Sequence, residues 1–183
     1  MKINDEPGKF TGPAEVRLVR TLPGPIERIW EYLTDPEKRA RWFAGGPMEL
    51  RVGGKMRFEF RHKDIAPGET PPEQYAKTHE GGRGFDGTVT RCEPPHLLAF
   101  TFGSDGESEA IFELTPQGKD VLLVLTHRST GGDLPSMHEF GAGWHTHLAQ
   151  LIAQLEGAPT PPFWPMMMEL RPEYDKARIA AQS

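Results

Sequence analysis

Residues 138–147, HEFGAGWHTH, hold three histidines and a glutamate, which are side chains that bind metals or transfer protons. A zinc-protease site requires His-Glu-x-x-His, which puts both imidazoles on one helical face. Here Ala142 occupies the position of the second imidazole. His145 and His147 are separated by about 200° of helical rotation, and His138 lies about 10 Å from His145 along the axis. We therefore expect no metal site in this segment.

The same segment can instead form one wall of a pocket. Trp144 belongs to an apolar stripe, His145 lies at the edge of that stripe, and His147 is expected to point to solvent. Gly141 and Gly143 each cost a helix about 1 kcal/mol relative to alanine. Their presence is explained equally well by close approach of a ligand or by a tight core contact without a ligand.

A long helix must position these residues. It is predicted to begin near Asp133 or Pro135 and to end at Gly157, a residue type typical of the position after a helix. Its apolar residues recur every three or four positions, at Met137, Phe140, Trp144, Leu148, Leu151 and Leu155.

The period of the remaining chain favours strands. An amphipathic helix in IERIWEYLTDP follows a strand at residues 15–22, and Gly53-Gly54 separates two strand-like runs in a predicted hairpin. Further strands are predicted in GFDGTVTRCEP, HLLAFTFG, SEAIFELTPQ and DVLLVLTHRS. A sheet with one apolar face must be covered, and the long C-terminal helix is the expected cover. The fold class is therefore α+β, with a cavity between a curved antiparallel sheet and the helix.

One domain is expected at residues 14–157, preceded by a mobile polar segment at 1–13. Residues 64–82 are rich in proline and glycine and are interpreted as a long loop that could act as a lid. Residues 158–183 form an extension with a short helix near 165–180. Its apolar cluster should pack on the body or on a partner subunit, because it is too apolar for free exposure to water.

Composition limits the functional classes. The net charge of −5 argues against a nucleic-acid partner, and the basic run at residues 37–41 is interpreted as a solvated helix end. Cys92 is the single cysteine, which excludes an intramolecular disulfide and fits a reducing cytoplasm. We find no signal peptide and no run of the ~18 apolar residues of a membrane span. A cytoplasmic protein without membrane contact is expected.

Several motifs together resemble one family, that of the C-terminal domain of the activator of Hsp90 ATPase, in the START-like (SRPBCC) superfamily. The resemblance spans residues 15–157 and rests on LPGPIERIWEYLTDPEKRARWFAGG, GGKMRFEF, GTVTRCEPPHLLAFTF, EAIFELTPQGKDVLLVLTHR and GWHTHLAQLIAQLEG. It implies a helix-grip fold, in which an antiparallel sheet of about six to seven strands wraps around the C-terminal helix and encloses an apolar cavity. The family shares no catalytic motif, so the resemblance assigns no catalytic residue.

The predicted cavity wall combines inward-facing strand residues with residues of the long helix. The candidate ligand-binding residues are Trp42, Phe58, Phe60, Phe100, Phe102, Phe112, His127, Phe140, Trp144 and His145. Polar groups that could orient a ligand are His62, His127, Arg128 and His145. No cofactor is expected.

Three functions remain open from the sequence. The first is binding of a small hydrophobic or amphipathic molecule. The second is a cyclase, dehydratase or hydrolase activity with His127 or His145 as acid or base. The third is a protein-interaction or client-binding module that uses the exposed sheet edge or the Met-rich extension, and the apolar cluster of the extension also makes a homodimer possible.

Overall fold

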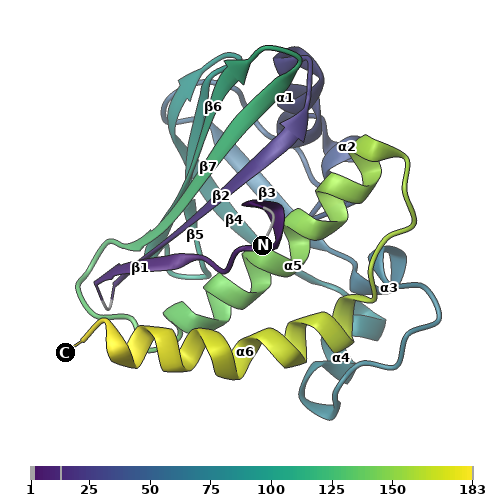
Figure 1. Cartoon of the computed structure of the whole chain (residues 1–183), viewed down its shortest axis with the longest axis vertical. Coiled ribbons are helices and arrows are strands. Elements are labelled where there is room, and N and C mark those ends of the chain that lie inside the picture. Colours follow the sequence, from purple (N-terminus) through teal and green to yellow (C-terminus); the bar gives the residue numbers. More distant parts are fainter. Residues whose placement is uncertain (1–2, 13, 183) are drawn as a thin grey trace.

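The structure is a computed structural model that describes residues 3–12 and 14–182. A seven-stranded antiparallel sheet with the order β1-β2-β7-β6-β5-β4-β3 curves around a long helix, α5 (Met137–Glu156) (Figure 1). The strands are β1 (Lys9–Gly12), β2 (Glu15–Pro23), β3 (Lys55–Phe60), β4 (Arg83–Glu93), β5 (Leu97–Phe102), β6 (Ser108–Gln117) and β7 (Asp120–Ser129). The predicted α+β helix-grip fold is therefore confirmed.

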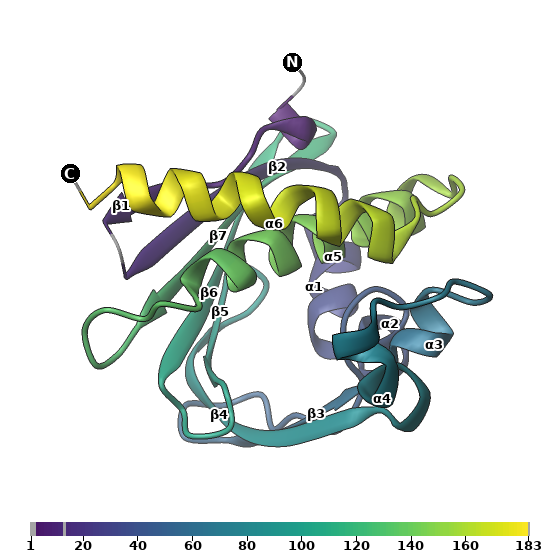
Figure 2. The same cartoon turned by 90° about the horizontal axis from the view of Figure 1, so that it is seen from below.

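The concave face of the sheet is built by alternating apolar side chains. In β7, every second residue from Val121 to His127 is buried. Leu125 pairs with Leu18 of β2 on one side and with Phe112 of β6 on the other, so three buried side chains lie in one row across the sheet. Such a period of two buries one face of a sheet. Seen from below, β2 lies close to α5, whereas β3 and β4 lie further from it, and α3 and α4 lie near the β3 end of the sheet (Figure 2).

Two short helices connect β2 to β3, namely α1 (Ile26–Thr34) and α2 (Pro36–Ala40). The Asp35 side chain accepts a hydrogen bond from the backbone of Lys38 and so caps α2. The interpretation of residues 37–41 as a solvated helix end is wrong for Arg39, which is 1% exposed. Its guanidinium donates to the carbonyl oxygens of Ala44 and Gly46, because the chain turns back over it.

Helix α5 ends as predicted, with Gly157 in the left-handed conformation at φ 65°. Beyond it lies α6 (Phe163–Ala180), which begins two residues before the predicted helix, ends where predicted, and packs along α5 (Figure 1). The apolar cluster of the extension therefore packs on the body of its own chain: Phe163 and Trp164 are buried.

Residues 64–82 are not the loop that was predicted. They include the end of α3 (His62–Ile65) and the whole of α4 (Glu73–Gly81). These two helices pack on each other. The predicted hairpin at Gly53-Gly54 is also wrong in its first strand, because residues before Gly54 make only isolated bridges to β3, such as Met48 to Met56. The chain there folds back on itself, and Gly54 donates to the Arg51 carbonyl instead of to a partner strand.

The N-terminal segment, expected to be mobile, is placed against the body. Among its described residues, a 3-10 turn, η1 (Ile3–Asp5), precedes β1, which pairs with β2; residues 1, 2 and 13 lie outside the described part. The backbone N–H of Gly8 donates to the Tyr174 hydroxyl of α6 at 2.6 Å. Among the helices of residues 3–12 and 14–182, none combines the length and the apolar character that a membrane span requires.

Candidate functional site

A cavity of about 210 Å³ lies between α5, the β3–β5 end of the sheet, and the segment formed by α3, α4 and the start of α6. We call it the central pocket. A water molecule needs roughly 10–15 Å³ of such space, so the pocket can hold an organic molecule. Its lining residues are Phe43, Phe60, His62, Tyr75, Thr78, Arg83, Phe85, Phe102, Gly103, Glu107, Glu139, Phe140, Gly143, Trp144, His147, Phe163, Trp164 and Met167.

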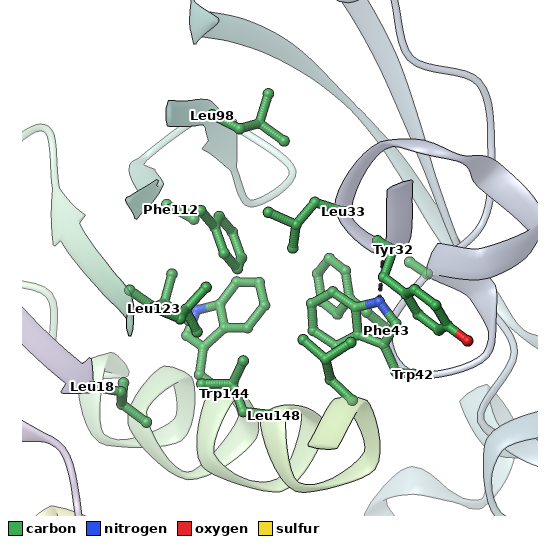
Figure 3. Close-up of a cluster of buried hydrophobic side chains, with 14 of the residues drawn as sticks. Leu18, Tyr32, Leu33, Trp42, Phe43, Leu98, Phe112, Leu123, Trp144 and Leu148 are labelled. Atoms are coloured by element: carbon green, nitrogen blue, oxygen red, sulfur yellow. Dashed lines mark hydrogen bonds between the residues drawn. The ribbon is translucent and has the colours of Figure 1, made fainter. Parts of the chain in front are cut away.

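The wall of the central pocket is continuous with the aromatic core. The Phe43 ring lies 4.7 Å from the Trp144 ring and 5.1 Å from the Phe60 ring, between centroids. Figure 3 shows Phe43 beside Trp42, whose indole N–H donates to the Tyr32 carbonyl at 2.8 Å. Phe43 was missed at the sequence level, although it follows Arg41-Trp42 directly in the segment that carries the family resemblance.

The structure divides the ten predicted site residues into two groups. Four line the central pocket: Phe60, Phe102, Phe140 and Trp144. The remaining six are buried outside its lining, in the core or, for His145, against α6: Trp42, Phe58, Phe100, Phe112, His127 and His145. Strand alternation identified the inner face of the sheet, but much of that face packs against α1, α5 and the Trp42-Phe43 segment, which leaves no space there for a ligand.

His127 positions the pocket wall from behind. Its Nδ1 accepts a hydrogen bond from the Trp144 indole at 2.8 Å, and its Nε2 lies 2.8 Å from the Ser108 hydroxyl. Ser108 in turn donates to the Phe102 carbonyl. Burial lowers the pKa of His127 to about 3. The ring is therefore neutral, fully hydrogen-bonded and fixed between the two side chains, Trp144 and Phe102, that face the pocket.

His145 faces away from the pocket, toward α6. Its Nδ1 lies 3.0 Å from the Tyr174 hydroxyl. That hydroxyl accepts a hydrogen bond from the N–H of Gly8, so its own proton is free to be donated to the imidazole. Burial lowers the pKa of His145 to about 4. Neither histidine proposed as an acid or base lies in the pocket lining. Arg128 pairs with Glu109 at 2.7 Å and also lies outside the lining.

The expectation that His147 points to solvent is wrong. His147 is 6% exposed and lines the pocket, and its Nδ1 lies 2.7 Å from the Trp42 carbonyl. The reason is that α5 is covered on two sides, by the sheet and by α6, so all residues from 144 to 148 are buried. Burial, with a smaller effect of His62, lowers the pKa of His147 to about 3.

One side of the pocket is formed where α6 meets the segment of residues 62–82. The Glu69 carboxylate accepts the backbone N–H groups of Phe163 and Trp164, both at 2.9 Å, and so caps the start of α6. The Trp164 indole donates to His79 Nδ1 at 3.1 Å and stacks on the Tyr75 ring at 5.0 Å. These contacts join residues 62–82 to the extension, and we call them the Trp164 junction.

The two glycines of α5 have different surroundings. A Cβ at Gly141 would lie 2.4 Å from the Tyr174 ring, whereas a Cβ at Gly143 would meet no atom within 4 Å. Gly141 therefore permits close packing of α6, which is the tight core contact. Gly143 faces open space in the pocket.

We expect Gly141→Ala to lower the free energy of unfolding by about 1–3 kcal/mol, because α6 must move away from the new methyl group. Gly143→Ala should raise it by about 0.5–1 kcal/mol, since alanine is the better helix former and has room. Urea denaturation of the two variants measures both changes. Equal effects of the two substitutions would contradict this assignment of the glycines.

No group of three or more His, Cys, Asp or Glu side chains within the described residues is arranged to hold a metal ion. The ionisable groups of the pocket divide by depth. Arg83 is exposed, Glu107 and Glu139 are partly exposed, and Glu139 pairs with Arg171 at 2.6 Å. The buried polar groups are imidazoles that are neutral at pH 7. The pocket is therefore apolar and uncharged inside, with charges at its mouth.

Comparisons with known proteins agree with this architecture. A protein encoded by gene BPP1335 from Bordetella parapertussis is 38% identical, with a TM-score of 0.77 over 93% of this chain and 91% of that one. CalU16 from Micromonospora echinospora is 26% identical, with a TM-score of 0.64 over 92% and 88% of the two chains. The Aha1 dimer from Colwellia psychrerythraea, 17% identical, shares the fold with a TM-score of 0.58 over 78% and 96%.

The comparison with curated proteins gives no match. The family model described as activator of Hsp90 ATPase homolog 1-like protein matches residues 23–156, from the end of β2 to the last residue of α5. That match covers most of the chain and agrees with the helix-grip fold, so this chain belongs to the activator of Hsp90 ATPase homolog 1-like family.

Proposed function

We propose that this protein binds a small hydrophobic or amphipathic molecule in the central pocket. The supporting observation is a cavity of about 210 Å³ whose walls are mainly aromatic rings and whose charged groups lie at the mouth. Ligand sites of this kind are largely apolar, with a few polar groups that fix orientation. The His127 network supports the proposal further, because it holds Trp144 in place without filling the cavity.

Native mass spectrometry of the protein as purified, followed by a denaturing spectrum of the same sample, is the direct test. An organic mass that is lost on denaturation is the expected result. Where the purified protein is empty, calorimetric titration with naphthalene derivatives tests the pocket itself. A protein that carries no ligand and binds none of these compounds would contradict the proposal.

A cavity-filling variant tests whether binding occurs in this pocket. Gly143→Leu should place an isobutyl group in the open space beside Trp144 and reduce affinity by at least about ten-fold, because the ligand and the new side chain occupy the same volume. The melting temperature reports that the fold is retained. Gly143→Ala is the matched control, since it changes the helix at the same residue but fills little of the cavity.

Two other functions receive less support. An acid–base enzyme would need a polar side chain that titrates near neutral pH inside the pocket, and the pKa values of His62 and His147 are lowered by burial to about 4 and about 3. A homodimer was expected from the apolar cluster of the extension, which is largely buried within the chain, with Met168 partly exposed at 37%. We propose a cytoplasmic location on the basis of the single thiol, Cys92.

A further inference from the structure

The interior of the central pocket contains two imidazoles in an otherwise aromatic lining. His147 comes from α5 and His62 from the start of α3, and their ring centroids are 5.8 Å apart. His147 also lies against the Phe43 and Phe163 rings, at 5.2 and 5.0 Å. A polar group of a bound molecule that enters between these two rings can form hydrogen bonds with both of them.

The tautomer of His147 is set by the main chain. A carbonyl oxygen can only accept, so the 2.7 Å contact with the Trp42 carbonyl requires the proton on Nδ1. The neutral ring then presents an unprotonated Nε2, which is an acceptor. No hydrogen bond to this Nε2 exists among residues 3–12 and 14–182. His147 lines the pocket, so a donor group of the occupant can reach this acceptor.

His62 carries an incomplete set of hydrogen bonds as well. Its ring stacks on Phe60 at 5.8 Å, and its Nδ1 is buried without a partner. Burial, with smaller effects of His79 and Arg83, lowers its pKa to about 4, so the ring is neutral at pH 7. A neutral imidazole has one N–H and one bare nitrogen, and it can both donate and accept.

The geometry points to a flat aromatic molecule with a hydroxyl group, of the phenol type, whose O–H donates to His147 Nε2 and whose oxygen lies near His62. This inference rests on the proposed function. A hydroxyl matches the pair because it donates and accepts at once. A carboxylate fits poorly, since it offers no proton to His147 and the charged side chain with the matching sign, Arg83, is exposed at the mouth.

Calorimetric titrations with 2-naphthol and with 2-methylnaphthalene, its nearly isosteric analogue without the hydroxyl, test the inference. We expect 2-naphthol to bind about ten-fold more tightly, because the analogue displaces water from the Nε2 of His147 and offers no donor in its place. The less hydrophobic compound would then be the better ligand. Equal affinities, or tighter binding of 2-methylnaphthalene, would overturn the hydroxyl inference and leave the proposed function standing. Absence of binding by both compounds would overturn the hydroxyl inference, and together with an empty native mass spectrum it would overturn the proposed function as well.

Two further measurements separate a direct hydrogen bond from a structural effect. In protein labelled with nitrogen-15 histidine, the Nε2 resonance of His147 should shift with 2-naphthol and remain in place with 2-methylnaphthalene. His147→Leu should abolish the preference for 2-naphthol, whereas His138→Leu, on the same helix outside the lining, should retain it. An unchanged Nε2 resonance in the 2-naphthol complex would refute the assigned contact.

Discussion

At pH 5 the protein is expected to be less stable than at pH 7 by about 4 kcal/mol from His127 and His147 alone. Burial lowers the pKa of each to about 3, so the folded state keeps both rings neutral across this range. The unfolded chain binds a proton at each below about pH 6.5. Protons therefore favour unfolding, and stability present above pH 6.5 is lost as the pH falls toward the folded-state values. Urea denaturation across this range measures the slope.

Two variants test whether the buried histidines cause the loss of stability at low pH. His127→Gln should be less stable at pH 7, because the Trp144 and Ser108 hydrogen bonds are disturbed, but its stability should fall less steeply between pH 7 and pH 5. His96→Gln, which replaces an exposed histidine, is the matched control and should keep the parent slope. A flat profile for the parent protein between pH 7 and pH 5 would show that the buried rings accept protons in the folded state.

Trp164→Ala is expected to lower the free energy of unfolding by about 3–5 kcal/mol, the usual cost of removing a buried tryptophan. The indole is 3% exposed and lies between Phe163, Tyr75 and His79. Its loss removes the centre of the Trp164 junction. Amide hydrogen exchange should therefore accelerate most in residues 62–82, before it changes in β6 and β7.

The control for this variant is Trp30→Ala, at a partly buried position on α1 that packs against the main core cluster and not against the cluster around Trp164. It should cost less than Trp164→Ala and leave exchange in residues 62–82 at the parent rate. Uniform acceleration across the sheet in Trp164→Ala would mean that residues 62–82 and the extension unfold only together with the whole domain.

The sheet and the long helix were predictable because their signals are local. Alternating residues in β7 and the three-to-four spacing of α5 each report which side of one element is buried, whatever covers it. Gly157 likewise marks the end of α5 through its own conformation. Such patterns predict six of the strands and the order of the elements. The need to bury the apolar face of the sheet then predicts that the sheet wraps around α5.

The pocket was only partly predictable because its wall joins distant segments. The apolar stripe of α5 predicts burial only on the side that faces the sheet. His147 lies outside that stripe, so it was predicted to point to solvent. The second cover, α6, comes from a proline-rich stretch. Helix α4 was missed for a related reason, because its own apolar pattern is weak and its position depends on Glu69 and Trp164. Tertiary contacts of this kind leave little trace in local periodicity.

The family match ends at residue 156, yet Phe163, Trp164 and Met167 of α6 form part of the pocket wall. The sheet and α5 are thus a framework that the family shares, and part of the wall of the proposed ligand site lies outside it. Changes at positions of the extension that face the pocket should alter ligand preference, whereas changes at the Trp164 junction should also cost stability. Relatives with different extensions would accordingly diverge in what they bind more quickly than in how they fold, and chimeras that exchange the segment after residue 157 offer a direct way to redesign specificity.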